Sequence, residues 1–146
     1  MREILFRGKR KDNGKWVEGY YAMQSNHACF EDELKYTHFI FKDIFLDFNL
    51  GGLQEFEVIP ETVGQYTGLT DKNGKKIFEG DILEFSDRLV VVFWRSNLGS
   101  WDCEFLKFTN RENSRDSMLP PNWKYESKVI CNIHDNPELL EGESNE

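Results

Sequence analysis

Two Asn-Gly dipeptides, at positions 13–14 and 73–74, constrain the fold of this chain more than any other feature. Both residues of an Asn-Gly pair tolerate positive φ, which the two central positions of a tight hairpin turn require. Segments rich in β-branched and aromatic residues flank each dipeptide, namely residues 4–7 and 16–21 around the first and residues 63–69 and 75–85 around the second. The pattern predicts two β-hairpins, the second with its turn at residues 71–74.

Short apolar runs separated by polar turns continue beyond residue 85, at residues 89–93, 101–108 and 128–133. Closely spaced strands with few helix-length periodic segments are typical of a small barrel. We therefore expect a mainly β fold in which an N-terminal antiparallel sheet packs on a C-terminal SH3-like small barrel. The predicted parts are residues 1–62 for the N-terminal β subdomain, residues 63–134 for the barrel, and residues 135–146 for a short helical turn and an acidic disordered tail.

The stretch from Phe30 to Phe48 fits two kinds of element. Its apolar residues at positions 30, 34, 41, 44, 45 and 48 are spaced like one face of a helix. Positions 36–41, however, are rich in aromatic and β-branched residues, which favour strands. We favour strands for this stretch, and the helix remains the alternative.

The sequence carries no pattern of export or membrane insertion. Its longest apolar runs span only a few residues, whereas a helix that crosses a bilayer needs about 20. The opening residues Met1, Arg2 and Glu3 do not begin an apolar signal segment. The three cysteines are odd in number and form no Cys-x-x-Cys pair, which fits a reducing compartment better than a disulfide framework. We expect a cytoplasmic protein without membrane contact.

Charge is divided unevenly along the chain, although the total is −8. Residues 1–11 carry five basic residues and one acid, a net charge of +4, whereas residues 18–61 carry −7 and residues 135–146 carry −5. The acidic charge of residues 18–61 and 135–146 disfavours nucleic-acid binding, because basic residues that neutralise phosphates supply most of the affinity of a protein for nucleic acid. The basic N-terminal edge is the candidate interaction site, and its residues are Arg7, Lys9, Arg10 and Lys11. We favour a solvated strand end for these residues, and contact with an anion or a protein is the alternative.

Patterns that could carry catalysis or bind metal are weak. Glu79 and Asp81 would share one face of a strand and could hold a cation, but Glu-Gly-Asp equally predicts a bend at Gly80 with Asp81 bonded to nearby backbone amides. A zinc site would draw on residues that lack the paired spacing of a closed site, namely His27, Cys29, His38, Cys103, Cys131 and His134. The glycines of residues 68–75 miss the spacing of a phosphate-binding loop. We therefore expect no catalytic, cofactor-binding or metal-binding residues, no cofactor, and no enzymatic activity.

Aromatic residues are abundant, with 12 Phe, 5 Tyr and 4 Trp. More than half of them should fill the core of a thin β fold. Those left outside favour an oligomer contact or a protein partner, because Trp and Tyr are enriched in such interfaces. We expect self-association as a homo-oligomer or binding to another protein.

One central stretch carries a family resemblance. Residues 59–85 read IPETVGQYTGLTDKNGKKIFEGDILEF and strongly resemble the YopX protein family of phages and prophages. The opening MREILFRGKR and residues 132–140, NIHDNPELL, are similar to the two ends of the same family. The resemblance implies a small, largely β, phage-associated protein of the bacterial host cytoplasm, in a family with no established activity and no catalytic residues to carry over. The expected function is an accessory role through binding to a host or phage protein or to itself, and the alternative is nucleic-acid binding through the basic edge.

Overall fold

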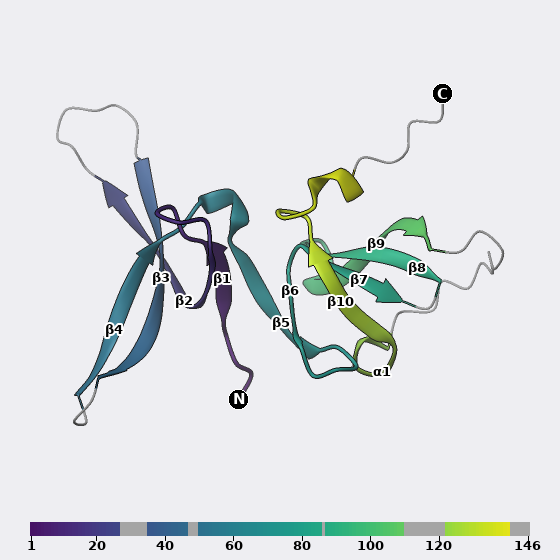
Figure 1. The fold of residues 1–146 in the computed structure, drawn as a ribbon, viewed down its shortest axis with the longest axis horizontal. Coiled ribbons are helices and arrows are strands. Elements are labelled where there is room, and N and C mark those ends of the chain that lie inside the picture. Colours follow the sequence, from purple (N-terminus) through teal and green to yellow (C-terminus); the bar gives the residue numbers. More distant parts are fainter. Residues whose placement is uncertain (27–34, 47–49, 86, 110–121, 141–146) are drawn as a thin grey trace. The chain divides into compact units, whose positions relative to one another are not determined.

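A computed structural model describes residues 1–26, 35–46, 50–85, 87–109 and 122–140 of the chain. The predicted mainly β class is confirmed, because antiparallel sheets make up the fold (Figure 1). The chain forms two compact units, Met1–Gln65 and Tyr66–Glu146. Each unit has its own cluster of buried hydrophobic side chains.

The first unit is built on an antiparallel sheet with the strand order β4-β3-β2-β1. Its elements are β1 (Phe6–Lys9), β2 (Trp16–Asn26), β3 (Lys35–Leu46), β4 (Leu50–Glu57) and a 3-10 helix, η1 (Pro60–Thr62). The first two residues of β5 (Gly64–Thr70) pair with β1. The Thr62 hydroxyl fastens η1 to the sheet, because it accepts a hydrogen bond from the Lys9 N–H at 2.8 Å and donates one to the Ile59 carbonyl at 2.7 Å.

The turn between β1 and β2 confirms the first predicted hairpin. Gly14 has a φ of +69°, and its N–H donates to the Arg10 carbonyl at 2.9 Å. The Arg10 N–H in turn donates to the Lys15 carbonyl at 2.9 Å. A residue with a Cβ adopts such a φ only with strain, so the glycine permits the tight reversal.

The ambiguous stretch from Phe30 to Phe48 contains β3, so the strand interpretation is confirmed for residues 35–46. Residues 30–34, 47 and 48 lie outside the described part of the chain. β3 pairs with β2 along one edge and with β4 along the other. This pairing on both edges explains why the stretch is a strand. The two neighbouring strands supply hydrogen-bond partners for the backbone of β3, although the spacing of its apolar residues also fits a helix.

The buried cluster of the first unit is small. It consists of Val17, Ile40 and Val58, against which Phe6, Phe56 and Val63 pack. Gly19 permits the close approach of β2 and β3, since a Cβ at this position would lie 2.1 Å from the Phe41 carbonyl oxygen. This glycine is therefore required by strand packing and not by a turn.

The second unit combines a hairpin with a four-stranded antiparallel sheet of order β10-β7-β8-β9. The sheet strands are β7 (Asp81–Phe85), β8 (Arg88–Arg95), β9 (Ser100–Phe108) and β10 (Ser127–Asn132). The remainder of β5 pairs with β6 (Lys76–Phe78) to form the hairpin. A short α-helix, α1 (Trp123–Glu126), precedes β10, and a 3-10 helix, η2 (Pro137–Leu139), follows it.

The C-terminal end of the described chain confirms the predicted helical turn. Pro137 stands at the start of η2, where its fixed φ and missing N–H are tolerated. Residues 141–146, which make up most of the predicted disordered tail, lie outside the described residues.

The second predicted turn, at residues 71–74, is confirmed between β5 and β6. Gly74 has a φ of +79°, and its N–H donates to the Asp71 carbonyl at 3.0 Å. The second arm of this hairpin is shorter than the segment 75–85, because the chain bends at Gly80, which has a φ of +81°. Beyond this bend β7 pairs with β8 and β10.

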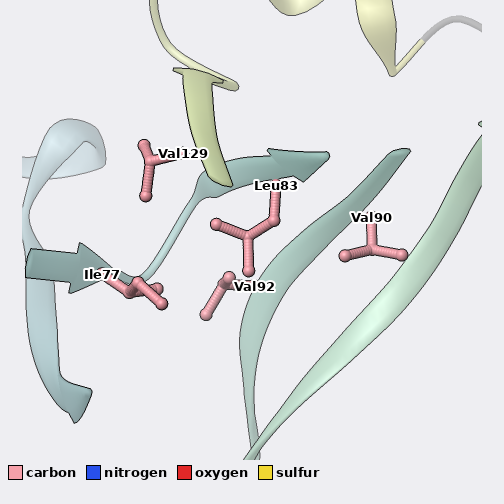
Figure 2. Close-up of a cluster of buried hydrophobic side chains, with 5 residues drawn as sticks. All are labelled: Ile77, Leu83, Val90, Val92 and Val129. Atoms are coloured by element: carbon pink, nitrogen blue, oxygen red, sulfur yellow. The ribbon is translucent and has the colours of Figure 1, made fainter. Parts of the chain in front are cut away.

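One hydrophobic cluster joins the hairpin and the sheet of the second unit. Its buried members come from β6, β7, β8 and β10 and are Ile77, Leu83, Val90, Val92 and Val129. Figure 2 shows Ile77, Leu83 and Val92 pointing toward one another at the centre of this cluster. Hairpin and sheet therefore share one hydrophobic interior, and β10 and β9 form the two edges of the four-stranded sheet in the described ranges.

Candidate interaction surface

The basic edge lies in the first unit, on β1 and the turn that follows it. Arg7 and Lys9 are two residues apart in β1, so they share one face of the sheet. Trp16 lies directly opposite Lys9 in the β1–β2 register, and directly opposed residues of an antiparallel pair also share a face. This face is opposite to the one that carries Val17, and we call it the outer face of the first unit.

Both cations lie over the indole ring of Trp16. The Arg7 guanidinium carbon is 4.7 Å from the ring centroid, and Lys9 Nζ is 5.5 Å from it. A cation within about 6 Å of an aromatic centroid is attracted by the ring quadrupole, by about 0.5–1 kcal/mol at exposed sites and more where water is excluded. All three side chains belong to half-buried residues. Arg7, Lys9 and Trp16 therefore form one ordered group, which we call the Trp16 cluster.

The other two residues of the basic edge engage carboxylates. Lys11 Nζ lies 2.6 Å from Glu57 Oε1. Arg10 donates to both carboxylate oxygens of Asp12, from Nε at 2.9 Å and from Nη2 at 2.5 Å. These hydrogen bonds and the charge of Arg10 lower the pKa of Asp12. Arg10 and Lys11 are thus neutralised locally by acids of the same unit.

Arg10 also lies on a different face from Arg7 and Lys9. Its guanidinium carbon is 4.4 Å from the ring centroid of Phe56. Phe56 packs against the core cluster and is directly opposite Ile40 in the β3–β4 register. The structure therefore divides the predicted site, because Arg10 belongs to the core face of the sheet.

Sequence reasoning missed an aromatic group that continues the outer face beyond the Trp16 cluster. Tyr20 is directly opposite Phe41 in the β2–β3 register, and the Phe39 ring centroid is 6.2 Å from that of Phe41. Tyr20 is 55% exposed, and the two phenylalanines are half-buried. The alternation of Phe39 and Phe41 with buried Ile40 is the signal that could have placed them, since successive strand residues face opposite sides.

Carboxylates complete the outer face. Glu55 and Glu57 lie opposite Phe41 and Phe39 in the β3–β4 register, and both residues are exposed. The outer face therefore carries cations on β1, aromatic side chains on β2 and β3, and carboxylates on β4.

The carboxylate pair at Glu79 and Asp81 has a structural explanation. Asp81 is 1% exposed, and its Oδ2 accepts a hydrogen bond from the Phe78 N–H at 2.8 Å. The positive φ of Gly80 makes the bend that this contact closes. The interpretation of Glu-Gly-Asp as a bend is therefore confirmed.

The described cysteines and histidines do not form a common site. His38 Nδ1 lies 2.6 Å from the Tyr21 hydroxyl, in the first unit. In the second unit, burial and then the charge of Asp102 raise the pKa of the Cys103 thiol to about 12, and burial is the main cause that raises the pKa of Cys131. Across the described residues, no three His, Cys, Asp or Glu side chains gather as a metal site requires. His27 and Cys29 lie outside the described part of the chain.

Helices are few and short in the described ranges. None of them has the length and apolar character needed to cross a membrane.

Fold and surface together define a mainly β protein with two antiparallel sheets and a mixed cationic, aromatic and acidic face. The family model of the YopX protein matches residues 5–141 of the chain. The chain therefore belongs to the YopX family. Among solved structures it is similar to the crystal structure of protein EF1440 from Enterococcus faecalis, at 21% sequence identity and a TM-score of 0.52, covering 97% of this chain and 100% of that one. This similarity concerns the fold alone, and a search of curated proteins gave no match.

Proposed function

We propose that this chain is a phage-associated accessory protein of the bacterial cytoplasm, which acts by binding another protein and not by catalysis. The observation that carries the proposal is the Trp16 cluster, in which Arg7 and Lys9 lie over one indole ring. Tryptophan and arginine are among the residues most enriched at the energetic hot spots of protein interfaces. Because the ring already orients both cations, a partner carboxylate would bind them with a smaller loss of side-chain entropy.

The composition of the outer face favours a protein partner over a phosphate backbone. Acids are interleaved with the basic edge, since Asp12 pairs with Arg10 and Glu57 pairs with Lys11. Glu18 and Glu55 are exposed on the same face and would repel phosphates. A surface that carries both signs of charge around aromatic side chains is suited to a protein surface of the same mixed character. A second copy of this chain is one such partner, and its binding would produce the expected homo-oligomer.

The test compares two double variants of the full chain. Arg7→Gln with Lys9→Gln removes both cations from Trp16, whereas Lys72→Gln with Lys128→Gln removes the same charge from exposed positions of the second unit. Sedimentation velocity measures self-association, and affinity capture from phage-infected cells recovers other partners. We expect the first variant to lose the oligomer or the captured protein and the second to retain it. Retention by both variants, or a wild-type chain that is monomeric and captures nothing, would contradict the proposal.

Nucleic-acid binding is the second candidate function, because residues 1–11 carry a net charge of +4. It predicts that retention on DNA or RNA falls steeply with rising salt, since each neutralised phosphate releases counterions. Tight retention at physiological salt that is lost in the Arg7→Gln, Lys9→Gln variant would place this function above protein binding.

A further inference from the structure

β9 forms one edge of the sheet in the second unit (Figure 1). It pairs with β8 from Ser100 to Phe108, and no other strand in the described ranges pairs with it. The strand is nine residues long and contains no proline and one lysine. Exposed edges are usually kept short or interrupted by proline and lysine, because they offer unpaired backbone groups to other chains. The register shift in its pairing with β8 and its lysine both fall after Phe105, so the part of β9 from Ser100 to Phe105 is a regular edge that can accept a further strand.

The hydrogen bonds of β8 show which backbone groups of β9 point outward. The Val92 carbonyl accepts a hydrogen bond from the Gly80 N–H at 2.9 Å, so it points toward the β7 side and away from β9. Cys103 is directly opposite Val92, and opposed residues of an antiparallel pair either bond each other or both point away. Cys103 therefore directs its N–H and C=O to the open edge. Trp101 and Phe105, two residues away on either side, do the same.

A carboxylate takes the place of a strand partner at the centre of this edge. Asp102 Oδ1 accepts a hydrogen bond from the Cys103 N–H at 2.8 Å, and Asp102 Oδ2 lies 2.5 Å from Arg95 Nη2. The Cys103 N–H therefore donates to the Asp102 carboxylate. In a complex with an added strand, the same N–H would donate to a backbone carbonyl of that strand. The edge is compatible with an acceptor at this position, and a partner carbonyl can replace the carboxylate.

An open hollow of about 560 Å³ lies beside the same edge, lined by Phe93, Arg95, Asn97, Cys103, Glu104 and Phe105. Phe93 is directly opposite Asp102 in the register, so it shares a face with Glu104, two residues further along β9. Glu104 is exposed, whereas the charge of Arg95 is balanced by Asp102. The guanidinium carbon of Arg95 lies 5.5 Å from the ring centroid of Phe93, so a lysine or arginine side chain entering the hollow would place its charge beside Glu104.

We propose that the open edge of β9 binds an extended, basic segment of a partner protein by strand addition. Backbone hydrogen bonds would form at Trp101, Cys103 and Phe105, and a lysine or arginine would occupy the hollow beside Glu104. In such complexes the main-chain bonds supply affinity, and sites for alternate side chains supply specificity. This edge belongs to the second unit and is separate from the Trp16 cluster, so each surface can be tested without the other.

The test measures fluorescence anisotropy of labelled peptides with the full-length protein. The first probe alternates threonine and lysine, and its matched control has glutamate in place of each lysine. A third peptide keeps the lysines but is methylated on every backbone nitrogen, which removes the hydrogen-bond donors of both of its edges without changing the charge. We expect the lysine peptide to bind at least about tenfold more tightly than the glutamate peptide, because like charges meet at Glu104 in the control. Methylation should abolish binding.

Two variants then locate the contact. Glu104→Lys should reverse the preference to the glutamate peptide, whereas Glu126→Lys changes the charge of another exposed residue of the second unit and should have no effect. Thermal unfolding of both variants confirms that they are folded. The proposal is overturned if the lysine peptide does not bind, if methylation leaves its binding unchanged, or if Glu104→Lys does not alter the preference.

Discussion

The side chain of Asp71, in the turn between β5 and β6, is hydrogen-bonded to β10 through Val129, 58 residues along the chain. Asp71 Oδ2 accepts a hydrogen bond from the Val129 N–H at 2.9 Å. The other oxygen, Oδ1, accepts from the Asn73 and Lys75 N–H groups at 2.8 and 2.9 Å. Asp71 is 2% exposed. The Asp71 carboxylate therefore stabilises the turn through Asn73 and Lys75 and also connects the turn to the sheet of the second unit through Val129.

Asp71→Ala should lower the free energy of unfolding by roughly 3 kcal/mol or more, because it leaves three backbone donors without their charged acceptor. Asp71→Asn is the near-isosteric comparison. Its amide keeps one oxygen but also carries an NH₂ group, which cannot accept from the N–H groups it meets, so the loss should be intermediate. Urea unfolding of the wild type and both variants measures these differences. An alanine variant as stable as the wild type would show that these hydrogen bonds contribute nothing.

Stability should also fall in acid through the same carboxylate. Burial opposes ionisation of Asp71, but the hydrogen bonds from Val129, Lys75 and Asn73, with the charge of Lys75, outweigh it and lower the pKa below its ordinary 3.8. A carboxylate with a lowered pKa in the folded state contributes stability that is complete above the unfolded pKa and is lost as the pH falls through the folded pKa. The stability difference between wild type and Asp71→Asn should therefore be constant near neutral pH and shrink below about pH 4. Urea unfolding across this range measures it, and a difference independent of pH would contradict the assignment.

Gly74→Val should destabilise the protein by roughly 1 kcal/mol or more, because a β-branched residue is strained at a φ of +79°. Gly51→Val is the matched control, since Gly51 lies in β4 with no heavy atom within 4 Å of its added Cβ. Thermal unfolding compares the two variants with the wild type. An unchanged melting point for Gly74→Val would mean that the turn accommodates a side chain at this position.

Cys103 should react slowly with thiol reagents in the folded protein. Its pKa is raised to about 12 by burial and by the charge of Asp102, and the thiolate is the reactive form. At pH 8 such a thiol is almost entirely in the unreactive protonated form. With Cys29 and Cys131 replaced by serine, labelling should be much slower in the native protein than in urea. Equal rates in the two conditions would show that the thiol is neither buried nor electrostatically suppressed.

The two Asn-Gly turns could be predicted from the sequence because their requirement is local. Gly14 and Gly74 both have positive φ, and the residues on either side of each turn favour strands. The helical turn at Pro137 and the bend at Gly80 follow in the same way from the backbone preferences of single residues. These features depend on a few neighbouring residues, so no knowledge of the rest of the chain is needed.

Long-range contacts were decided only by the tertiary structure. Alternation along a strand separates Lys9 from Arg10, but only the strand register places Lys9 over Trp16 and Arg10 over Phe56. The bond from Asp71 to Val129 likewise depends on which strand lies beside the turn. Strand order and register come from the summed burial and pairing of whole segments, which no local preference of the residues encodes. The sequence therefore determines which charged and aromatic residues are available to the candidate surfaces. Only the fold determines which of these residues lie together.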